Sequence, residues 1–326
     1  MIVDNFNRVH DYLRISLTDN CNLRCFYCMP KEDYEFTPAS GLMQADEIYS
    51  LSKIFISEGV KKIRLTGGEP FVRKDAAQII QLLSLLNIQL AVTTNGTRLH
   101  EFVDVLETSD IQAVNISLDT LQPEKFRQIT RRDLFNTVRQ NIESFVHKGF
   151  RVKINVVVMK DFNDNEINDF IEWTKYFPVQ IRFIEFMPFA GNRWTGNQVV
   201  SLKEILKTIE SRYEFFAEEG EKNDTGKKYR IPNHAGSFAV ISTMTSPFCS
   251  TCNRMRLTAD GKLKNCLFSK GETDLLTPFR QGKDILPLIH ENIRSKAKEL
   301  GGQFTAGLKE VNTQAIENRS MITIGG

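Results

Sequence analysis

The stretch Asp11–Lys31, DYLRISLTDNCNLRCFYCMPK, decides how the rest of the sequence is interpreted. It begins with an apolar, β-branched run from Tyr12 to Thr18, which is typical of a buried strand. Three cysteines follow, Cys21, Cys25 and Cys28, separated first by three residues and then by two. A loop of this kind directly after a strand presents three thiols together at one end of a sheet.

The first two thirds of the chain alternate short apolar runs with longer segments of helical period. This alternation predicts a parallel sheet with helices packed against it. Gly59 and Gly149 stand where two of the helices should end. The expected strands are Tyr12 to Thr18, Lys62 to Thr66, Gln89 to Thr94, Ala113 to Leu118, Val152 to Met159 and Gln180 to Met187. Six units are too few for a complete barrel, so the sequence predicts an α/β fold with an incomplete (β/α)6 TIM-type barrel.

The pattern changes after Met187. The later part predicts one helix and short strands around the turn Asp260-Gly261, namely Leu202 to Ser211, Phe238 to Ser242 and segments of Met255 to Leu267. We interpret this part as a C-terminal α+β extension that closes the open side of the barrel. The expected division is 1–190 for the partial barrel and 191–326 for the extension.

Composition limits the possible partners and compartments. The 326 residues are 41% hydrophobic and 25% charged, and 42 Lys and Arg nearly balance 40 Asp and Glu. A net charge of +2 gives no general footprint for nucleic acid or an anionic membrane, so any polyanion needs a local cluster of cations. The sequence shows no secretory leader and no apolar run long enough for a membrane span. We therefore expect a cytoplasmic protein.

The six cysteines form two separate groups of three, which suggests two metal sites rather than disulfides. A zinc site usually has four ligands. Three thiolates on an iron–sulfur cluster leave one iron without a protein ligand, and such an iron can bind a cofactor or substrate. A structural zinc loop is the alternative for the first group.

The second group is Cys249, Cys252 and Cys266, again three ligands rather than four. A zinc ribbon completed by His234 is the simplest alternative to a cluster here. Arg254 and Arg256 follow two positions apart, so a strand would project both guanidinium groups on one face beside the metal. Arginine matches phosphate oxygens in bidentate geometry.

The spacing of the first group, with an aromatic residue before the last cysteine, resembles the signature of the radical S-adenosylmethionine (SAM) superfamily. That resemblance implies a 4Fe-4S cluster whose open iron binds SAM and cleaves it to a 5′-deoxyadenosyl radical. Thr66-Gly-Gly-Glu-Pro70 fits the superfamily's glycine-rich element. The cofactor contacts that the resemblance implies are Tyr27, Gly68, Ser117 and Met187.

Over nearly the whole chain the sequence further resembles the molybdenum cofactor biosynthesis protein A family, GTP 3′,8-cyclase. The runs that carry this resemblance are DYLRISLTDNCNLRCFYCMPK, KKIRLTGGEPFVR, LAVTTNGT, INVVVMK, IRFIEFM, CSTCNRMRLTADGKLKNCLF and the terminal IGG. It implies a second 4Fe-4S cluster that binds guanine. The implied substrate contacts are Arg14, Lys62, Arg64, Thr93, Lys153, Arg182, Arg254, Met255 and Arg256. The tail residues Gly325 and Gly326 are expected to enter the active site.

The family resemblance implies a lyase that removes hydrogen from C3′ of GTP and joins C3′ to C8, the first step of molybdenum cofactor synthesis. An external electron donor, the next enzyme of the pathway (cyclic pyranopterin monophosphate synthase) and a homodimer are further expectations from the family. Two alternatives remain open at this stage. One is a radical SAM maturase with an auxiliary cluster, and the other is a zinc-stabilised, non-catalytic binding module.

Overall fold

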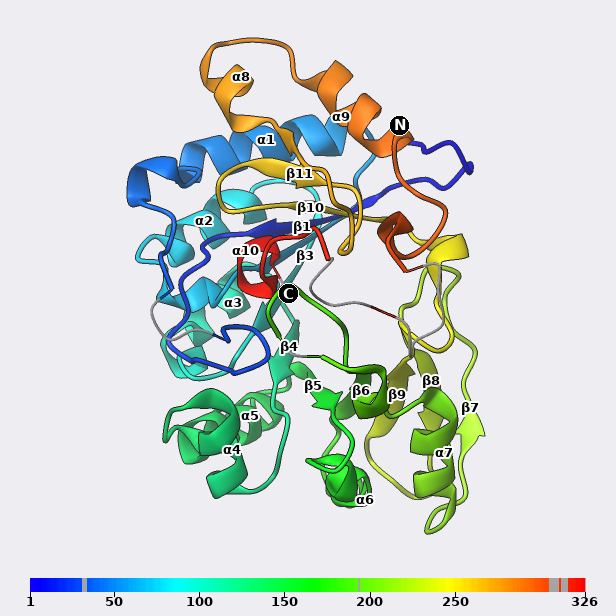
Figure 1. Ribbon diagram of the computed structural model, residues 1–326. Coiled ribbons are helices and arrows are strands. Elements are labelled where there is room, and N and C mark those ends of the chain that lie inside the picture. Colours follow the sequence, from blue (N-terminus) through cyan, green and yellow to red (C-terminus); the bar gives the residue numbers. More distant parts are fainter. Residues whose placement is uncertain (31–33, 193, 305–310, 312–315, 326) are drawn as a thin grey trace.

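The computed structural model describes residues 1–30, 34–192, 194–304, 311 and 316–325. Within these residues one sheet has the strand order β12-β11-β10-β1-β2-β3-β4-β5-β6-β9-β8-β7 (Figure 1). The strands are β1 Tyr12–Ser16, β2 Lys62–Thr66, β3 Gln89–Thr94, β4 Ala113–Ser117, β5 Arg151–Val158, β6 Gln180–Glu185, β7 Phe216–Ala217, β8 Lys227–Arg230, β9 Ser237–Ile241, β10 Arg254–Leu257, β11 Lys262–Lys264 and β12 Thr273–Asp274. The helices are α1 Ala45–Ser57, α2 Ala76–Ser84, α3 Val103–Thr108, α4 Pro123–Thr130, α5 Phe135–His147, α6 Ile167–Trp173, α7 Leu202–Glu210, α8 Leu276–Arg280, α9 Leu286–Arg294 and α10 Met321–Ile324.

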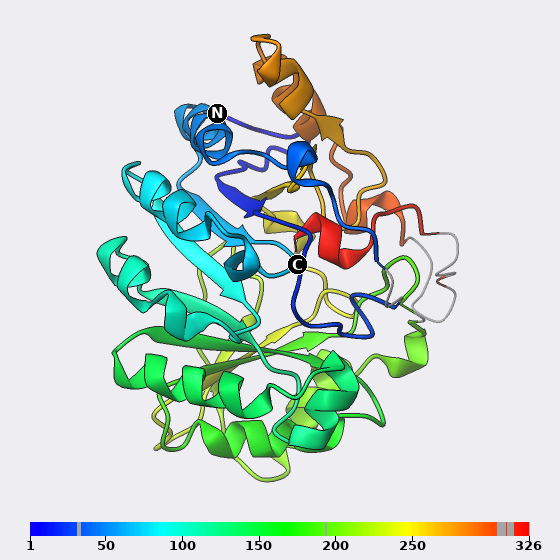
Figure 2. The same ribbon diagram turned by 90° about the vertical axis from the view of Figure 1, so that its left-hand side faces the viewer.

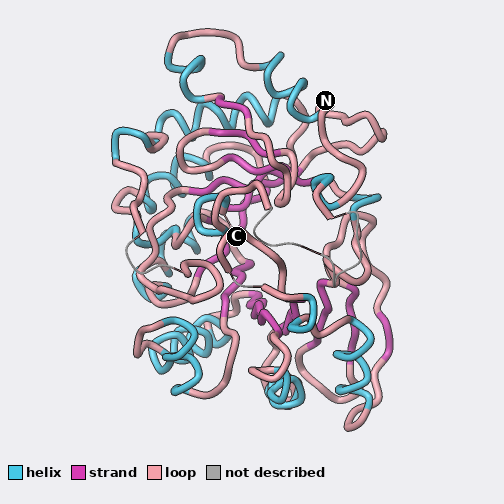
Figure 3. Tube along the Cα trace, in the orientation of Figure 1, coloured by secondary structure: helices cyan, strands magenta, loops and turns pink. Residues whose placement is uncertain are grey.

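Strands β1 to β6 are neighbours in chain order, and every pair among them is parallel. Helices α1 to α6 lie on the outer side of the arc that these strands form (Figure 3). The predicted α/β partial barrel is confirmed, and β2 and β3 have the predicted bounds. Strand β1 is shorter than expected because the chain turns away after Ser16 to form the cysteine loop.

The C-terminal extension continues the same sheet at both of its edges. Strand β9 pairs in parallel with β6, and β10 pairs in parallel with β1. The hairpin predicted around Asp260-Gly261 joins β10 to β11. In the described part of the chain the outermost strands, β7 and β12, do not pair with each other. The division at residue 190 stays a prediction, because strands from both parts share one sheet.

Alternation along the strands separates the core from the barrel interior. Leu13 and Ile15 on β1 are fully buried against the helices, whereas Arg14 between them lies on the opposite, inner face. The same alternation places Arg64 of β2 on the inner face. The barrel interior therefore carries polar and cationic side chains, while the layer between sheet and helices is apolar.

The helices that support the sheet begin and end at recognisable residues. Ser201 and Glu204 form a capping box at the start of α7, where the Ser201 hydroxyl accepts from the Glu204 N–H. Gly59 and Gly149 follow α1 and α5 with φ values of +97° and +83°, the left-handed conformation that ends helices. Both predicted helix ends are confirmed.

The short helix α10 lies on the inner side of the arc of strands, next to the C-terminus (Figure 2). It carries the end of the chain back to the carboxyl ends of β1 and β2. None of the helices in the described part of the chain combines the length and apolar character that crossing a membrane requires.

Candidate active site

The first cysteine group lies in the loop after β1, at the carboxyl ends of the parallel strands. Backbone hydrogen bonds from Arg24 N to Thr130 O and from Phe26 N to Ile129 O fasten this loop to the end of α4, at 2.9 and 3.0 Å. The three thiols line a cavity of about 160 Å³ together with the glycine turn after β2. This end of parallel strands is where such barrels carry their chemistry.

The thiols of the first group are free and partly buried. Burial raises the pKa of Cys21 to about 11, and it also raises the pKa values of Cys25 and Cys28. For Cys25, the neighbouring thiols add to the effect of burial. Deprotonating all three therefore needs a strongly positive partner such as a metal centre.

The arrangement fits a cluster better than a single ion. Across the described residues, no three His, Cys, Asp or Glu side chains converge on one ion position. A cubic iron–sulfur cluster binds each thiolate through a different iron, so it needs sulfur atoms set further apart. Among the described residues that line this cavity there is no fourth Cys or His to complete a structural zinc loop, the alternative for the first group.

The glycine turn packs directly against the cysteine loop. A Cβ built on Gly68 would lie 2.4 Å from the carbonyl oxygen of Asn20 and 2.6 Å from that of Asp19. The Gly68 N–H donates to Thr18 O at 2.6 Å. Any side chain at this position would push the turn away from the thiols, which explains the requirement for glycine.

Glu69 and Asn95 connect the turn to the cysteine loop. The fully buried Glu69 carboxylate accepts from Asn95 N at 2.6 Å and from the Thr94 hydroxyl at 2.7 Å, and burial raises its pKa to about 7. The Asn95 amide nitrogen in turn lies 3.7 Å from the Cys21 sulfur. Neither residue was assigned a role from the sequence, although both lie inside the quoted motifs.

The predicted cofactor contacts fall in two places. Tyr27 and Ser117 line the first-cysteine cavity. The Tyr27 hydroxyl donates to Asp119 Oδ2 at 2.6 Å, and burial raises the Asp119 pKa to about 6. Met187 does not line this cavity; it lines a second one, which contains the second cysteine group and is called the second-cysteine cavity below. The two cavities share lining residues, among them Thr93 and Met321, so they adjoin each other.

The second cysteine group lines the second-cysteine cavity, of about 190 Å³. Arg254 and Arg256 project into it from the inner face of β10, as predicted. Met255 between them is fully buried in the apolar core. Its side chain therefore faces away from the cavity, and the predicted substrate contact of Met255 would be made by its backbone.

Positive charge surrounds Cys252. The Lys296 ammonium lies 3.4 Å from its sulfur, and the Leu300 N–H lies 3.5 Å from the Cys249 sulfur. Burial alone would raise the Cys252 pKa, but the charges of Arg254 and Lys296 lower it to about 7. These charges make the Cys252 thiol easier to deprotonate than an ordinary cysteine thiol.

His234 is not near this group. Its Nδ1 atom lies 2.8 Å from the Thr174 hydroxyl, and its ring packs edge-on against Tyr213. It does not line the second-cysteine cavity. A zinc ribbon completed by His234 therefore does not fit the structure.

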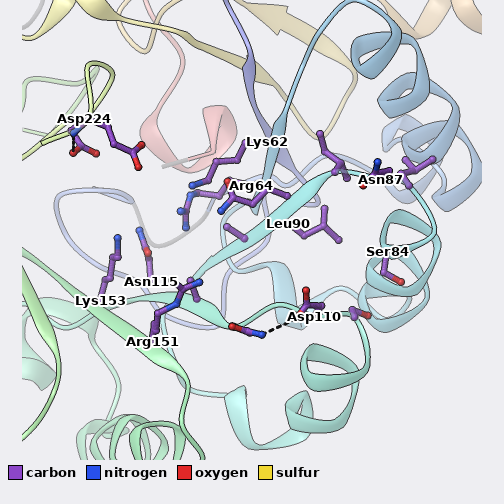
Figure 4. A pocket seen from close by; sticks show the side chains of 18 of the residues that line it. Lys62, Arg64, Ser84, Asn87, Leu90, Asp110, Asn115, Arg151, Lys153 and Asp224 are labelled. Atoms are coloured by element: carbon purple, nitrogen blue, oxygen red, sulfur yellow. Dashed lines mark hydrogen bonds between the residues drawn. The ribbon is translucent and has the colours of Figure 1, made fainter.

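Cations fill the barrel interior between the cysteine groups and the amino ends of the strands. Lys62, Arg64 and Lys153 line a third cavity of about 760 Å³ there (Figure 4). Burial, followed by repulsion from neighbouring cations, lowers the Lys153 pKa to about 8. Burial is also the main reason that the Arg182 pKa falls to about 10.

The hydrogen bonds of these cations go to neutral oxygens, although the carboxylates of Glu221 and Asp224 also line the cation-lined cavity. Arg64 donates to Val92 O at 2.9 Å and to the Thr93 hydroxyl at 3.3 Å, and Arg182 donates to the Thr225 hydroxyl at 3.0 Å. Among the described residues, none of six cations of the interior forms a salt bridge with an Asp or Glu side chain. The six are Lys62, Arg64, Lys153, Arg182, Arg254 and Arg256. Buried charges of one sign are costly without a counter-ion, so this interior suits a multivalent anion.

The C-terminal tail reaches the same space. The Gly325 carbonyl accepts a hydrogen bond from Arg256, and a Cβ built on Gly325 would lie 3.1 Å from the Thr66 methyl group. Met321 lines both cysteine cavities. Arg319 anchors the tail through a bidentate ion pair with Asp260, at 2.9 and 2.8 Å. Gly326 lies outside the described residues.

Comparison with known proteins agrees with this arrangement. Residues 15–174 match the radical SAM superfamily model, and residues 179–301 match the model described as Molybdenum Cofactor Synthesis C. In fold, the chain is similar to SuiB of Streptococcus suis bound to S-adenosylmethionine, with a TM-score of 0.61 and 17% identity over 88% of this chain and 68% of that one.

Curated relatives cover almost the entire sequence. The chain is 44% identical to the Arabidopsis thaliana mitochondrial GTP 3′,8-cyclase, over all of this chain and 84% of that protein. It is 39% identical to GTP 3′,8-cyclase of Peptoclostridium acidaminophilum, over 92% and 93% of the two chains. It is 42% identical to molybdenum cofactor biosynthesis protein 1 of Mus musculus over 99% of this chain, but it spans only 51% of that longer protein. The chain therefore belongs to the GTP 3′,8-cyclase family of radical SAM proteins.

Proposed function

We propose that this protein is a GTP 3′,8-cyclase that carries out the first step of molybdenum cofactor synthesis. The observation that carries the proposal is a pair of adjoining cavities, each lined by three free thiols, with the cations of the barrel interior beside them. One of these cavities suits a metal-bound cofactor, and the other, with the cations beside it, suits a base and a triphosphate. A peptide-maturing enzyme has no evident use for the cation-lined cavity.

Each thiol group would hold one 4Fe-4S cluster through three cysteines, with the fourth iron open to the cavity. One cluster would be held by Cys21, Cys25 and Cys28 and would bind SAM. Cluster and SAM together would supply the radical that removes hydrogen from C3′ of the ribose. Cys249, Cys252 and Cys266 would hold the cluster that receives guanine.

The protein's own side chains then position and neutralise the substrate. Arg14, Arg182 and the arginines of β10 face the second-cysteine cavity, and the lysines of β2 and β5 face the cation-lined cavity beyond it. Guanidinium and ammonium groups match phosphate oxygens, so these side chains would neutralise the charge of a triphosphate held in this interior. Closure of the C3′–C8 bond needs no protein nucleophile, so orientation and exclusion of water are the main contributions of the chain.

The tail is proposed to complete the site. It occupies the carboxyl ends of β1 and β2 and places Met321 between the two cysteine groups, with its sulfur 3.9 Å from the Cys28 sulfur. An external electron donor and transfer of the product to cyclic pyranopterin monophosphate synthase are part of this proposal, as is a homodimer. Free thiols in both groups suit the reducing cytoplasm that we propose as its compartment.

The decisive experiment is anaerobic reconstitution followed by incubation with SAM, a reductant and each of the four ribonucleoside triphosphates in turn. Formation of 5′-deoxyadenosine together with a cyclised nucleotide is expected with GTP alone. Reconstituted protein should contain about eight irons per chain, four for each cluster. Zinc without iron, or equal turnover with ATP, would contradict the proposal.

A further inference from the structure

Two of the cavities in the barrel interior meet at a single side chain. One is the second-cysteine cavity, and the other is the cation-lined cavity at the amino ends of the strands. Among the described residues that line them, Asn115 alone belongs to both. A ligand that extends from one cavity into the other therefore has to pass this residue.

The position of Asn115 follows from the alternation of β4. Val114 and Ile116 on either side are fully buried in the apolar core, so the Asn115 side chain lies on the inner face of the sheet. Figure 4 shows it beside Lys153, extending into the cation-lined cavity. The neighbouring strand β5 holds Lys153 directly opposite Asn115 in the sheet register.

The Asn115 carboxamide has an unmet hydrogen-bonding requirement. The residue is only 4% exposed, and its Oδ1 atom has no hydrogen-bond partner among the described residues. Buried polar atoms without partners are rare in folded proteins, and each one calls for an explanation. A ligand that donates a hydrogen bond at this point would supply the missing partner.

We infer that Asn115 binds the ribose of the nucleotide substrate, with Oδ1 accepting a hydrogen bond from one of the ribose hydroxyl groups. This inference rests on the proposed function, which puts the base at the second thiol group and the phosphates among the cations. Ribose is the part of a nucleotide that joins base to phosphates, so it occupies the junction. Holding one hydroxyl fixes the sugar ring, and thereby the orientation of C3′ toward its reaction partners.

The test is a thermodynamic cycle between a protein variant and a ligand hydroxyl, measured by equilibrium binding without reductant so that no turnover occurs. The reconstituted wild-type protein and Asn115→Leu are each titrated with GTP, 2′-deoxy-GTP and 3′-deoxy-GTP. Wild type should bind one of the two analogues about tenfold more weakly than GTP, the size expected for one hydrogen bond. Asn115→Leu should bind GTP about tenfold more weakly and should not distinguish that analogue from GTP.

Asn168→Leu is the matched control. Asn168 is also buried, at 8% exposed, and its Oδ1 also lacks a partner among the described residues, but it lies on α6 and donates to Thr208 O at 3.1 Å, away from the cavities. This variant should bind all three nucleotides as wild type does. If Asn115→Leu does not fold, Asn115→Ser gives the same cycle, because the shorter serine side chain cannot reach the sugar.

The outcomes separate this inference from the proposed function. If wild type binds GTP no better than ATP, the proposed function falls and this inference falls with it. A second outcome is that wild type binds GTP selectively, and removing either ribose hydroxyl weakens binding to Asn115→Leu by the same factor as binding to wild type. In that case only the role of Asn115 is overturned. Unchanged GTP affinity in both Asn115 variants would overturn it in the same way.

Discussion

Lys296 donates a hydrogen bond to the sulfur of Cys252 at 3.4 Å and another to the carbonyl of Arg254 at 3.0 Å. The lysine is 4% exposed, and within the described residues it forms no ion pair with a carboxylate. A buried cation needs an anion nearby, so the Cys252 thiolate acts as its counter-charge. Lys296 thus links the turn that follows α9 to the second cysteine group, and it places a positive charge beside the proposed cluster.

The first prediction concerns the reduction potential of that cluster. A neighbouring positive charge favours the reduced, more negative state, so Lys296→Met should lower the potential. We expect a decrease of about 60 mV, which corresponds to a tenfold change for a one-electron couple. Redox titration followed by electron paramagnetic resonance measures this. Lys298→Met, two residues away on the surface, is the control and should leave the potential unchanged.

The second prediction concerns pH and stability. Burial raises the Asp119 pKa from 3.8 to about 6, so the fold favours the protonated carboxyl group. This contribution to stability is complete below pH 3.8 and is lost as pH rises through 6. Asp119→Asn cannot ionise, so its stability should rise by roughly 2.5 kcal/mol relative to wild type between pH 4 and pH 7. Urea unfolding of the metal-free protein at both pH values measures the difference; a constant difference would contradict the assignment.

Much of the fold could be predicted from the sequence because the signals were local. Each of the first six strands is a short apolar run, and the cysteine spacing is visible within a single loop. The contribution of Lys296 could not be predicted, since it is separated from Cys252 by 43 intervening residues and no pattern marks it. The way β9 and β10 extend the two edges of the sheet also depends on long-range pairing. Neighbouring residues on a strand face opposite sides, so the contact predicted at Met255 between the two arginines would come from its backbone.

The third prediction concerns the anchor of the tail. Arg319 is held by both oxygens of Asp260 and by Glu272. Burial would raise the Asp260 pKa, but hydrogen bonds from Arg319 and Thr258 and the charges of Arg319 and Lys262 together hold it at about 2. Arg319→Met should release α10 from the cavities while changing global stability by less than about 1 kcal/mol, because the pair is partly exposed. Hydrogen exchange of residues 316–325 should become faster. Arg319→Lys, which keeps a positive charge between Asp260 and Glu272, is the control and should keep exchange slow.

The fourth prediction tests the end of the tail. Gly325 has a φ of +72°, and a Cβ there would lie within 3.2 Å of both Thr66 and Ser16. Gly325→Ala should therefore cost about 1–2 kcal/mol of tail docking, and together with Gly326→Ala it should suppress cyclisation. Iron content should stay at the wild-type value. Unchanged turnover in the double variant would remove the tail from the mechanism.

The last prediction separates the two cysteine groups. Cys252→Ala should remove the second cluster while leaving the first intact, because the two groups lie on different loops joined only through the cavity. Iron content should fall from about eight to about four per chain. Reductive cleavage of SAM should persist, whereas GTP cyclisation should fall by more than about 100-fold because the base loses its anchor and the ribose its alignment. Cys25→Ala is the reciprocal control and should abolish both reactions. If Cys252→Ala instead stopped SAM cleavage with the first cluster still present, the two cysteine groups could not have the separate roles assigned to them.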